Sequence, residues 1–163
     1  TRLVANLPYN VAVPVLLTAL EALPSLESVT VMVQSEVADR LAAEPGSRTY
    51  GVPSVKTAWY AAARRTITIG RTVFWPAPNV DSALVELSRR RPPATSASRS
   101  QVFAVVDAAF AQRRKTLRNT LKPLLSVEDI EAAEVDPALR PEQLDLAAFV
   151  RLANRLAELP GNR

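Results

Sequence analysis

The stretch that decides the fold is Glu27–Ala43, which reads ESVTVMVQSEVADRLAA. Its first part, Val29–Val33, is an unbroken run of β-formers, typical of a strand buried on both faces of a sheet. Its second part, Ser35–Ala43, has helical spacing, with its serine as the expected N-cap. The apolar run Leu3–Ala5 and the helical pattern Val13–Leu23 precede this stretch. Strands and helices that alternate over short connections predict a parallel α/β sheet.

The pattern changes further along the chain. Val52–Ala63 predicts another helix. Thr66–Ile69 and Ala83–Leu87 are short strand patterns that could pair as an antiparallel hairpin at the edge of the sheet. The stretch between them, Gly70–Asp81, contains two prolines and is expected to be a rigid loop rather than a tight turn.

A proline- and serine-rich segment divides the chain. We therefore predict three parts: an α/β part at 1–90, a linker at 91–100 and a helical part at 101–163. Within the helical part, Ser126 and Asp129 have the spacing of a capping box, and Asp145 is placed to cap a last amphipathic helix. The predicted fold class is thus α/β followed by a small all-α domain.

Composition excludes several kinds of chemistry. The 163 residues are 48% hydrophobic and 22% charged, which is enough to form a packed core. The sequence contains no cysteine and no histidine. Thiolate and histidine metal sites, disulfides and serine–histidine triads are therefore excluded, and we expect no metal. The most apolar window, residues 11–23, is too short to cross a bilayer, so we expect a cytoplasmic protein with no membrane partner.

Positive charge is concentrated in the middle of the chain. The net charge is +4, yet residues 64–122 carry twelve Lys or Arg against three Asp or Glu, a net of +9. Such a block is typical of a surface that binds a polyanion. A solvated basic face without a partner would give the same pattern.

The sharpest local motif is Asn6-Leu7-Pro8-Tyr9, which follows the first expected strand. Ligands of open α/β sheets bind at the carboxyl ends of the strands. There, the Asn6 side-chain oxygen and the Leu7 or Pro8 carbonyl could accept both hydrogens of an exocyclic amine, while Tyr9 stacks on the ring that carries it. Four such residues also occur in ordinary strand-to-helix turns.

A second motif is the aromatic and proline-rich run Phe74–Ser82. An aromatic side chain on a proline-stiffened loop is suited to hold a flipped base from the side opposite Tyr9. Phe74 is the candidate for that role. Both Phe74 and Trp75 could instead fill the core of the hairpin, and this is the interpretation we favour for Trp75.

A third motif is the basic run at residues 112–122. If it is a helix, Arg114, Arg118 and Lys122 share one face and Lys115 lies beside them. Such a face would hold phosphates, because like charges at this spacing repel one another unless an anion lies between them. A merely solvated face is the alternative.

Together these motifs resemble one family, the small-subunit ribosomal RNA adenine dimethyltransferases of the KsgA type. The similarity runs through nearly the whole chain in the family's order, and it is carried by Asn6–Asn10, Gln34–Leu41, the Tyr50-Gly51 pair, Phe74–Val85 and Phe110–Asn119. It implies the C-terminal part of a Rossmann-like methyltransferase sheet followed by a helical RNA-binding domain. It also implies transfer of methyl groups from S-adenosylmethionine to N6 of two adjacent adenosines in the 3′-terminal hairpin loop of 16S ribosomal RNA, during ribosome biogenesis.

The resemblance implies roles for individual residues. Asn6, Leu7, Pro8 and Tyr9 would be catalytic, with Asn6 also next to the cofactor, and Tyr9 and Phe74 would enclose the adenine. The residues implied to bind RNA are Arg113, Arg114, Lys115, Arg118 and Lys122.

The sequence departs from this family in one respect. The family's glycine-rich cofactor loop lies upstream of the Asn-Leu-Pro-Tyr motif, and only five residues precede that motif here. We therefore expect a fragment, inactive alone, of a protein that functions as a monomer on the small ribosomal subunit or its precursor. An uncovered sheet edge makes self-association of the fragment possible. Two other functions stay open: a large-subunit ribosomal RNA adenine methylase of the antibiotic-resistance type, and a non-catalytic RNA-binding assembly module.

Overall fold

A computed structural model describes residues 1–162 of the chain. The chain forms two compact units. Unit 1 contains Thr1–Ala43 and Thr57–Arg91, and unit 2 contains Glu44–Lys56 and Pro92 onward. Each unit is built from two separate stretches of sequence, so the chain crosses between them three times.

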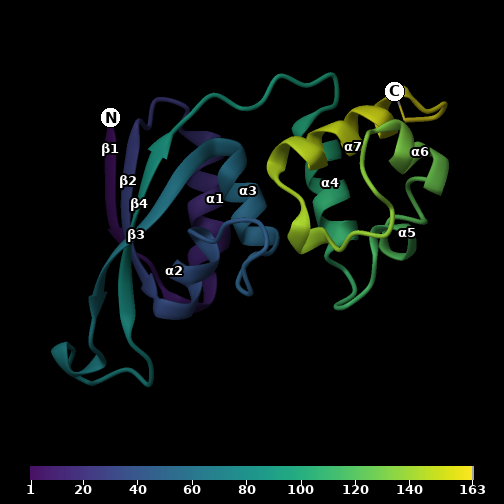
Figure 1. Ribbon diagram of the computed structural model, residues 1–163. Coiled ribbons are helices and arrows are strands. Elements are labelled where there is room, and N and C mark those ends of the chain that lie inside the picture. Colours follow the sequence, from purple (N-terminus) through teal and green to yellow (C-terminus); the bar gives the residue numbers. More distant parts are fainter. Residues whose placement is uncertain (163) are drawn as a thin grey trace. The chain divides into compact units, whose positions relative to one another are not determined.

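Unit 1 is built around a four-stranded mixed sheet in the order β1-β2-β4-β3 (Figure 1). The strands are β1 (Arg2–Asn6), β2 (Ser28–Gln34), β3 (Ala61–Ile69) and β4 (Ser82–Arg89). Strand β1 pairs in parallel with β2, whereas β4 is antiparallel to both β2 and β3. The predicted parallel start and antiparallel hairpin are therefore confirmed, and β1 and β3 are the two edges.

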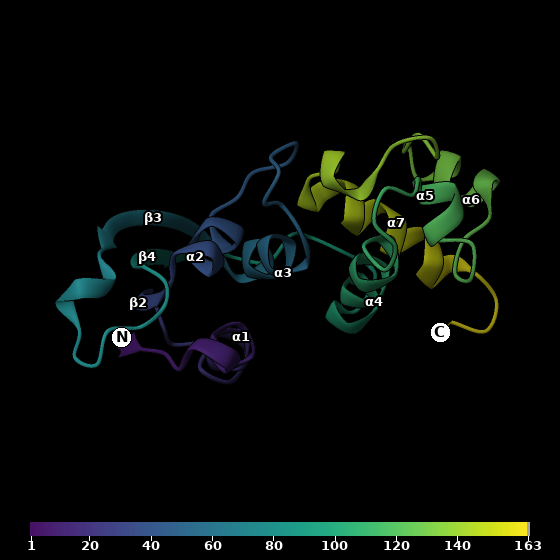
Figure 2. The same ribbon diagram turned by 90° about the horizontal axis from the view of Figure 1, so that it is seen from below.

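Helices α1 (Ala12–Ala22) and α2 (Ser35–Leu41) lie on the same face of this sheet (Figures 1 and 2). Every second residue of β2 is fully buried on that side, and the residues between them are only half-buried. The prediction that β2 is buried on both faces is therefore wrong, because no described helix covers the opposite face. Ser35 is also not an N-cap, since it is the first residue of α2 and follows Gln34 at the cap.

Two arginines at the end of β4 donate hydrogen bonds to backbone carbonyl groups at the ends of two helices. The Arg89 guanidinium donates to the carbonyl oxygens of Leu20, Leu23 and Leu26 at 2.7, 2.9 and 2.6 Å, just where α1 ends. Arg90 donates to the carbonyl oxygen of Ala58 at 2.8 Å. Carbonyl groups at helix ends lack partners within the helix, so these arginines stabilise the ends electrostatically.

Unit 2 is helical, and its core lies between α4 and α7 (Figure 2). Its elements are α4 (Arg99–Ala109), α5 (Leu117–Thr120), α6 (Val127–Ala132), α7 (Leu146–Glu158) and the short 3-10 turn η3 (Pro141–Gln143). Helix α3 (Val52–Tyr60) begins in unit 2 and ends in unit 1, and the 3-10 turns η1 (Tyr9–Val11) and η2 (Arg71–Val73) belong to unit 1. The predicted capping box of Ser126 and Asp129 is present, and Asp145 caps α7 through a bond from the Ala148 N–H. Hydrogen bonding to Ser126 is the main cause that lowers the pKa of Asp129.

Residues 44–56 pack with unit 2 although they precede β3 in sequence. The hydroxyl of Tyr50 donates to the carbonyl oxygen of Leu144 at 2.7 Å. The ring of Tyr50 meets Phe110 edge-on at 6.2 Å between centroids. Helix α3 then runs from this segment into unit 1 and ends at Tyr60, three residues before the predicted end, because Ala61 already begins β3. No helix among the described residues is long and apolar enough to cross a membrane.

Candidate functional site

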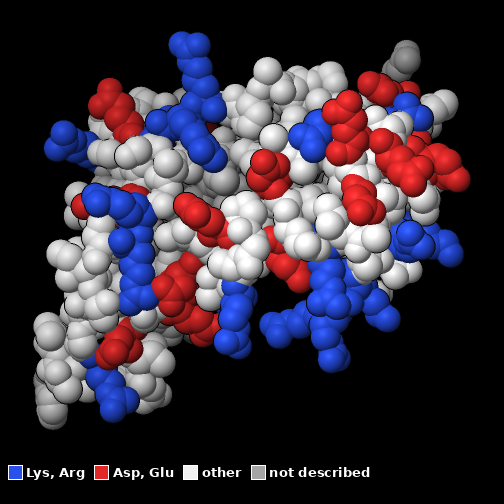
Figure 3. Space-filling view, viewed as in Figure 1, with Lys and Arg blue, Asp and Glu red and all other residues white. Residues whose placement is uncertain are grey.

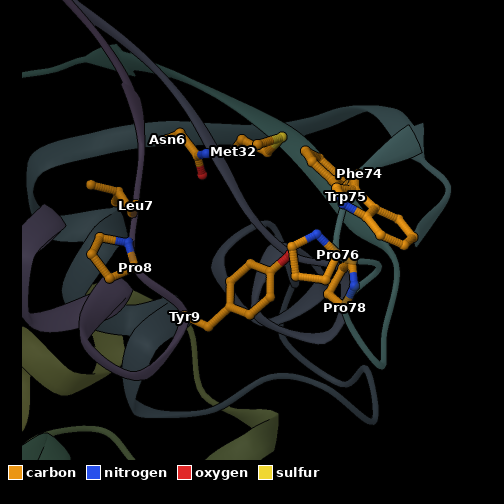
Figure 4. A pocket seen from close by; sticks show the side chains of 9 residues that line it. All are labelled: Asn6, Leu7, Pro8, Tyr9, Met32, Phe74, Trp75, Pro76 and Pro78. Atoms are coloured by element: carbon orange, nitrogen blue, oxygen red, sulfur yellow. The ribbon is translucent and has the colours of Figure 1, made fainter. Parts of the chain in front are cut away.

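A cavity of about 490 Å³ opens at the carboxyl end of β1, within unit 1 (Figure 4). This volume is in the range of small-molecule and nucleobase sites. Its walls come from two distant parts of the sequence, and the lining residues are Asn6, Leu7, Pro8, Tyr9, Met32, Phe74, Trp75, Pro76 and Pro78. The structure thus brings the predicted catalytic motif and the predicted stacking residue Phe74 to one pocket.

Asn6 is the last residue of β1, where it lies opposite Met32 of β2. The backbone N–H of Leu7 donates to the Met32 carbonyl at 3.2 Å, which continues the pairing one residue beyond the strand. This bond fixes the backbone where the strand becomes a turn. The Asn6 amide points into the cavity in Figure 4, and among the described residues it has no hydrogen-bond partner. Its donor and acceptor groups are available to a ligand.

Pro8 and Tyr9 form the turn that leads into α1. The Pro8 carbonyl accepts the Val11 N–H at a long 3.3 Å, so the second lone pair of this oxygen is open. The hydroxyl of Tyr9 and the Oγ of Ser82 lie 2.8 Å apart in a hydrogen bond. Ser82 is fully buried at the start of β4. Because one end of Tyr9 is in the η1 turn and the other is held by Ser82, its ring has a fixed orientation at the pocket.

Phe74 and Trp75 lie in the segment 70–81, which we call the aromatic loop. Its two ends are joined by a bond from the Arg71 N–H to the Asp81 carboxylate at 2.9 Å. Phe74 is half-buried and lines the cavity, whereas 97% of Trp75 is exposed. The interpretation of Trp75 as a core residue is therefore wrong. In an extended backbone neighbouring side chains point to opposite sides, and Phe74 is extended, so only one of the two can face inward.

The chemistry that this pocket offers is neutral. No charged side chain is among its lining residues. It offers one free amide, open carbonyl oxygens, and aromatic and proline rings. These groups suit a planar ring with an exocyclic amine: the oxygens accept the amine hydrogens, and the rings contact its two faces.

The predicted basic helix at residues 112–122 is not present. Helix α4 ends at Ala109, Arg114 has a left-handed φ of 65°, and α5 begins only at Leu117. The first N–H groups of α5 donate to carbonyl oxygens of a distant segment, Leu117 to Leu139 at 2.9 Å and Arg118 to Pro137 at 3.0 Å. A continuous helix would have bonded these groups internally, and it would also have stacked like charges.

The basic side chains are nevertheless grouped, in a loop followed by a single helical turn. We call residues 113–122 the basic segment. Its cationic members, Arg113, Arg114, Lys115, Arg118 and Lys122, are all exposed. None of these five forms an ion pair with another described residue. Figure 3 shows Lys and Arg side chains gathered at the edge of unit 2 where this loop and α5 lie in Figure 1.

Sequence reasoning missed three residues of the site. Met32 lines the pocket because β2 places it beside Asn6, and Trp75 forms part of its rim. Ser82 holds Tyr9 from 73 positions away. A serine that ends a predicted loop and begins a strand carries no signal of such a partner, since strand register alone decides where it lies.

The sequence matches the family described as ribosomal RNA adenine dimethylase over residues 1–158. It is 62% identical to "Ribosomal RNA small subunit methyltransferase A" from Kineococcus radiotolerans, covering 99% of this chain and 54% of that protein. It is 55% identical to the protein of the same name from Pseudomonas aeruginosa, over 99% of this chain and 61% of that one. The chain therefore spans little more than half the length of these curated relatives.

Two solved structures have a similar fold. A dimethyladenosine transferase from Plasmodium falciparum superposes with a TM-score of 0.78 at 20% identity, covering 93% of this chain and 64% of that one. The 23S rRNA methyltransferase ErmE gives a TM-score of 0.70 at 24% identity, over 96% and 65%. The predicted fold class, part of a Rossmann-like methyltransferase sheet followed by helices, is confirmed.

Proposed function

Since the chain belongs to the ribosomal RNA adenine dimethylase family, we propose that it is the target-holding part of an S-adenosylmethionine-dependent adenine N6-dimethyltransferase of the small ribosomal subunit. The proposed substrate is 16S ribosomal RNA in the subunit or its precursor. The proposed targets are two adjacent adenosines in the 3′-terminal hairpin loop, which are dimethylated during ribosome biogenesis in the cytoplasm. The names of the relatives support the choice of the small subunit.

One observation carries this proposal: Asn6, Tyr9 and Phe74 line the same cavity, although Tyr9 and Phe74 are 65 positions apart in the sequence. The Asn6 oxygen and the Pro8 carbonyl would accept the two hydrogens of the adenine N6 amine. Tyr9 and Phe74 would contact the base on its two faces. A base held this way has left the RNA stack, and single-stranded loops release a base at low cost.

The described residues provide few of the contacts that S-adenosylmethionine, the methyl donor, needs. Asn6 is the residue proposed to contact it. None of the four glycines lines the pocket, and none forms a Gly-x-Gly pair. No acidic side chain for a ribose lines the pocket either. The described residues therefore do not by themselves fit the whole cofactor, and we propose that this chain alone neither binds it tightly nor methylates.

The role of the chain's own residues is to orient N6. S-adenosylmethionine, when bound, supplies an electrophilic methyl group. Two acceptors in fixed positions hold both amine hydrogens, so that the nitrogen lone pair points away from Asn6 and Pro8. Methylation leaves N6 positively charged, and such a nitrogen loses its proton to water without a strong base. This chemistry is compatible with a pocket that contains no histidine.

The basic segment is proposed to bind the RNA backbone. Lysine and arginine contacts to phosphate position RNA without reading its sequence. The five exposed, unpaired cations of the segment support this role. Base contacts in the pocket would then supply the selectivity.

The test is transfer of radiolabelled methyl groups to undermethylated small subunits, using the chain extended to the full length of its relatives. We expect label at N6 of adenine, and none from the chain alone. RNA binding without any incorporation would favour the non-catalytic assembly module. Label confined to large-subunit RNA would favour the antibiotic-resistance type of methylase. Micromolar binding of S-adenosylmethionine by the chain alone would contradict the proposed division of the site.

A further inference from the structure

Trp75 is the most exposed large apolar side chain among the described residues, at 97%. The other tryptophan, Trp59, is 5% exposed and lies in α3. Two more apolar side chains of the aromatic loop are open to water, Val73 at 72% and Val80 at 44%. An exposed indole and two exposed valines on one short loop offer apolar surface for contact with a partner.

The position of Trp75 indicates the kind of partner that would bind to it. Trp75 directly follows Phe74 and lies on the rim of the same pocket, while its indole points away from the cavity in Figure 4. A polynucleotide whose base occupies the pocket extends from it in two directions, and a neighbouring base that leaves on the Trp75 side lies beside the loop. Unstacked bases of single-stranded RNA bind to exposed aromatic faces.

Charge and rigidity agree with that partner. Arg71 is exposed on the same loop, where its guanidinium contacts the Asn79 carbonyl at 3.3 Å and leaves other N–H groups open to a phosphate. The loop is fixed by the bond between the Arg71 N–H and Asp81, and by the bond from the Val73 N–H to the Gly70 carbonyl at 3.1 Å. A loop held in place before binding loses little entropy when a base stacks on it.

We propose that Trp75 is a second stacking platform, which binds a nucleotide adjacent to the target adenosine and so helps to select a single-stranded run of bases. This inference rests on the proposed function, because it takes the cavity as the site of the target base. It gives the aromatic loop two roles: its inner side contacts the target, and its outer side contacts the neighbour.

The test uses fluorescence of the full-length protein with a short single-stranded RNA that contains two adjacent adenosines. Trp75 is exposed and Trp59 is buried in this chain, so the emission that is lost in a Trp75→Phe variant of the full-length protein reports on Trp75, and stacking should quench that acrylamide-accessible part. RNAs that carry formycin, a fluorescent adenosine isomer that retains the exocyclic amine, at the target position, or 2-aminopurine at either neighbouring position, report on each base separately. In the unmodified protein we expect quenching at the target and at one neighbour.

Substitutions then separate the two sites. Trp75→Ala should abolish quenching at the neighbour and weaken RNA binding about tenfold, the scale expected for loss of one stacked base. Trp75→Tyr should retain most of both effects. Phe74→Ala should abolish quenching at the target. The control is Val15→Ala, which removes another exposed apolar side chain, on α1, and should change neither signal.

The outcomes distinguish this inference from the function on which it rests. Quenching at the target that depends on Phe74, with no neighbour affected by Trp75→Ala, would overturn the platform and leave the proposed function standing. Absence of quenching at every position would overturn both. Because the side chain lies almost wholly in water, we expect Trp75→Ala to melt at the temperature of the unmodified protein, so a loss of binding cannot be ascribed to unfolding.

Discussion

The pocket and the basic segment, the two regions that we propose to bind RNA, are opposite in chemical character. The pocket is uncharged, and its parts are held by hydrogen bonds that span the sheet, such as the bond between Tyr9 and Ser82. The basic segment is charged and exposed, and its five cations have no described ion-pair partner. The first arrangement is suited to selection by shape and hydrogen bonding, and the second is suited to attraction by charge. Substitutions should therefore change rate in one region and salt-dependent affinity in the other.

The largest effect is expected at Asn6. In the full-length protein, Asn6→Ala removes the acceptor that we propose for the N6 amine, so kcat for methyl transfer should fall about 10²- to 10³-fold. RNA affinity should stay nearly constant, because the charges are untouched. Initial rates of label incorporation and filter-binding titrations measure the two quantities. The control is Thr18→Ala, an exposed position on α1 outside the pocket. Undiminished methylation by Asn6→Ala would remove the pocket from the mechanism.

The next effect concerns the basic segment. The double substitution of Arg114 and Arg118 to alanine should reduce the slope of log affinity against log salt by about 1.4 to 2, since each phosphate contact contributes about 0.7 to 1. The matched control is Arg64→Ala, which removes an arginine already paired with Glu86 at 2.6 Å. Equal slopes in the double variant and the unmodified protein would show that RNA contacts another surface.

A smaller effect is expected at Ser82, which touches Tyr9 and not the proposed substrate. Ser82→Ala should lower kcat about tenfold, because a freed ring holds the base less well. Tyr9→Phe breaks the same hydrogen bond, so the two changes together should cost little more than either alone. Fully additive losses would show that the two residues act independently. Ser88→Ala, in the same strand and exposed, is the control.

The smallest effect on RNA binding is expected at Tyr50, which supports Phe110 just before the basic segment. Tyr50→Phe leaves the Leu144 carbonyl without its donor and should lower the free energy of unfolding by about 1 kcal/mol. The salt slope should not change. Urea unfolding at pH 8, followed by RNA titration, checks both statements, and a changed slope would mean that the two features are coupled.

Tyr50 also gives a pH dependence. Burial, with a smaller contribution from the charge of Asp145, raises the pKa of Tyr50 to about 12. The unfolded value is near 10, so the folded state holds the proton more tightly. The corresponding stability is complete below pH of about 10 and is lost as the pH rises from there through 12. Tyr50→Phe should lack this decline, and unfolding curves at pH 9 and 11 would show the difference.

The sequence predicted elements where local pattern and tertiary structure agree. Apolar periodicity located the strands. The spacing of Ser126 and Asp129 located the start of α6, and Asp145 located the start of α7. The basic helix was predicted wrongly because carbonyl oxygens of Pro137 and Leu139 bind the start of α5, and no local pattern encodes them. Trp75 was assigned to the core from its residue type alone, although its neighbour Phe74 already occupies the inward position.

Part of the candidate site was predictable because it is formed by residues that are close together in the sequence. Asn6, Pro8 and Tyr9 adjoin in sequence, and the carboxyl end of a strand is a general location for sites. That Phe74 shares their cavity follows only from the pairing of β4 with β2, which places the end of the aromatic loop beside the end of β2, the strand that lies next to β1. The contribution of Ser82 depends on that same register.

Unit 2 is formed by two separate stretches of sequence, and this has a consequence for protein engineering. A protease that cuts within residues 91–94 leaves residues 44–56 covalently attached to unit 1 on both sides. Because residues 44–56 pack within unit 2, the two fragments stay together after the cut. A piece that begins at Pro92 would lack Tyr50, and with it the ring against Phe110 and the donor to Leu144. Exchange of the helical unit between relatives must therefore carry residues 44–56 along with it. Chimeras joined only at the proline-rich segment should be recovered mainly as insoluble protein.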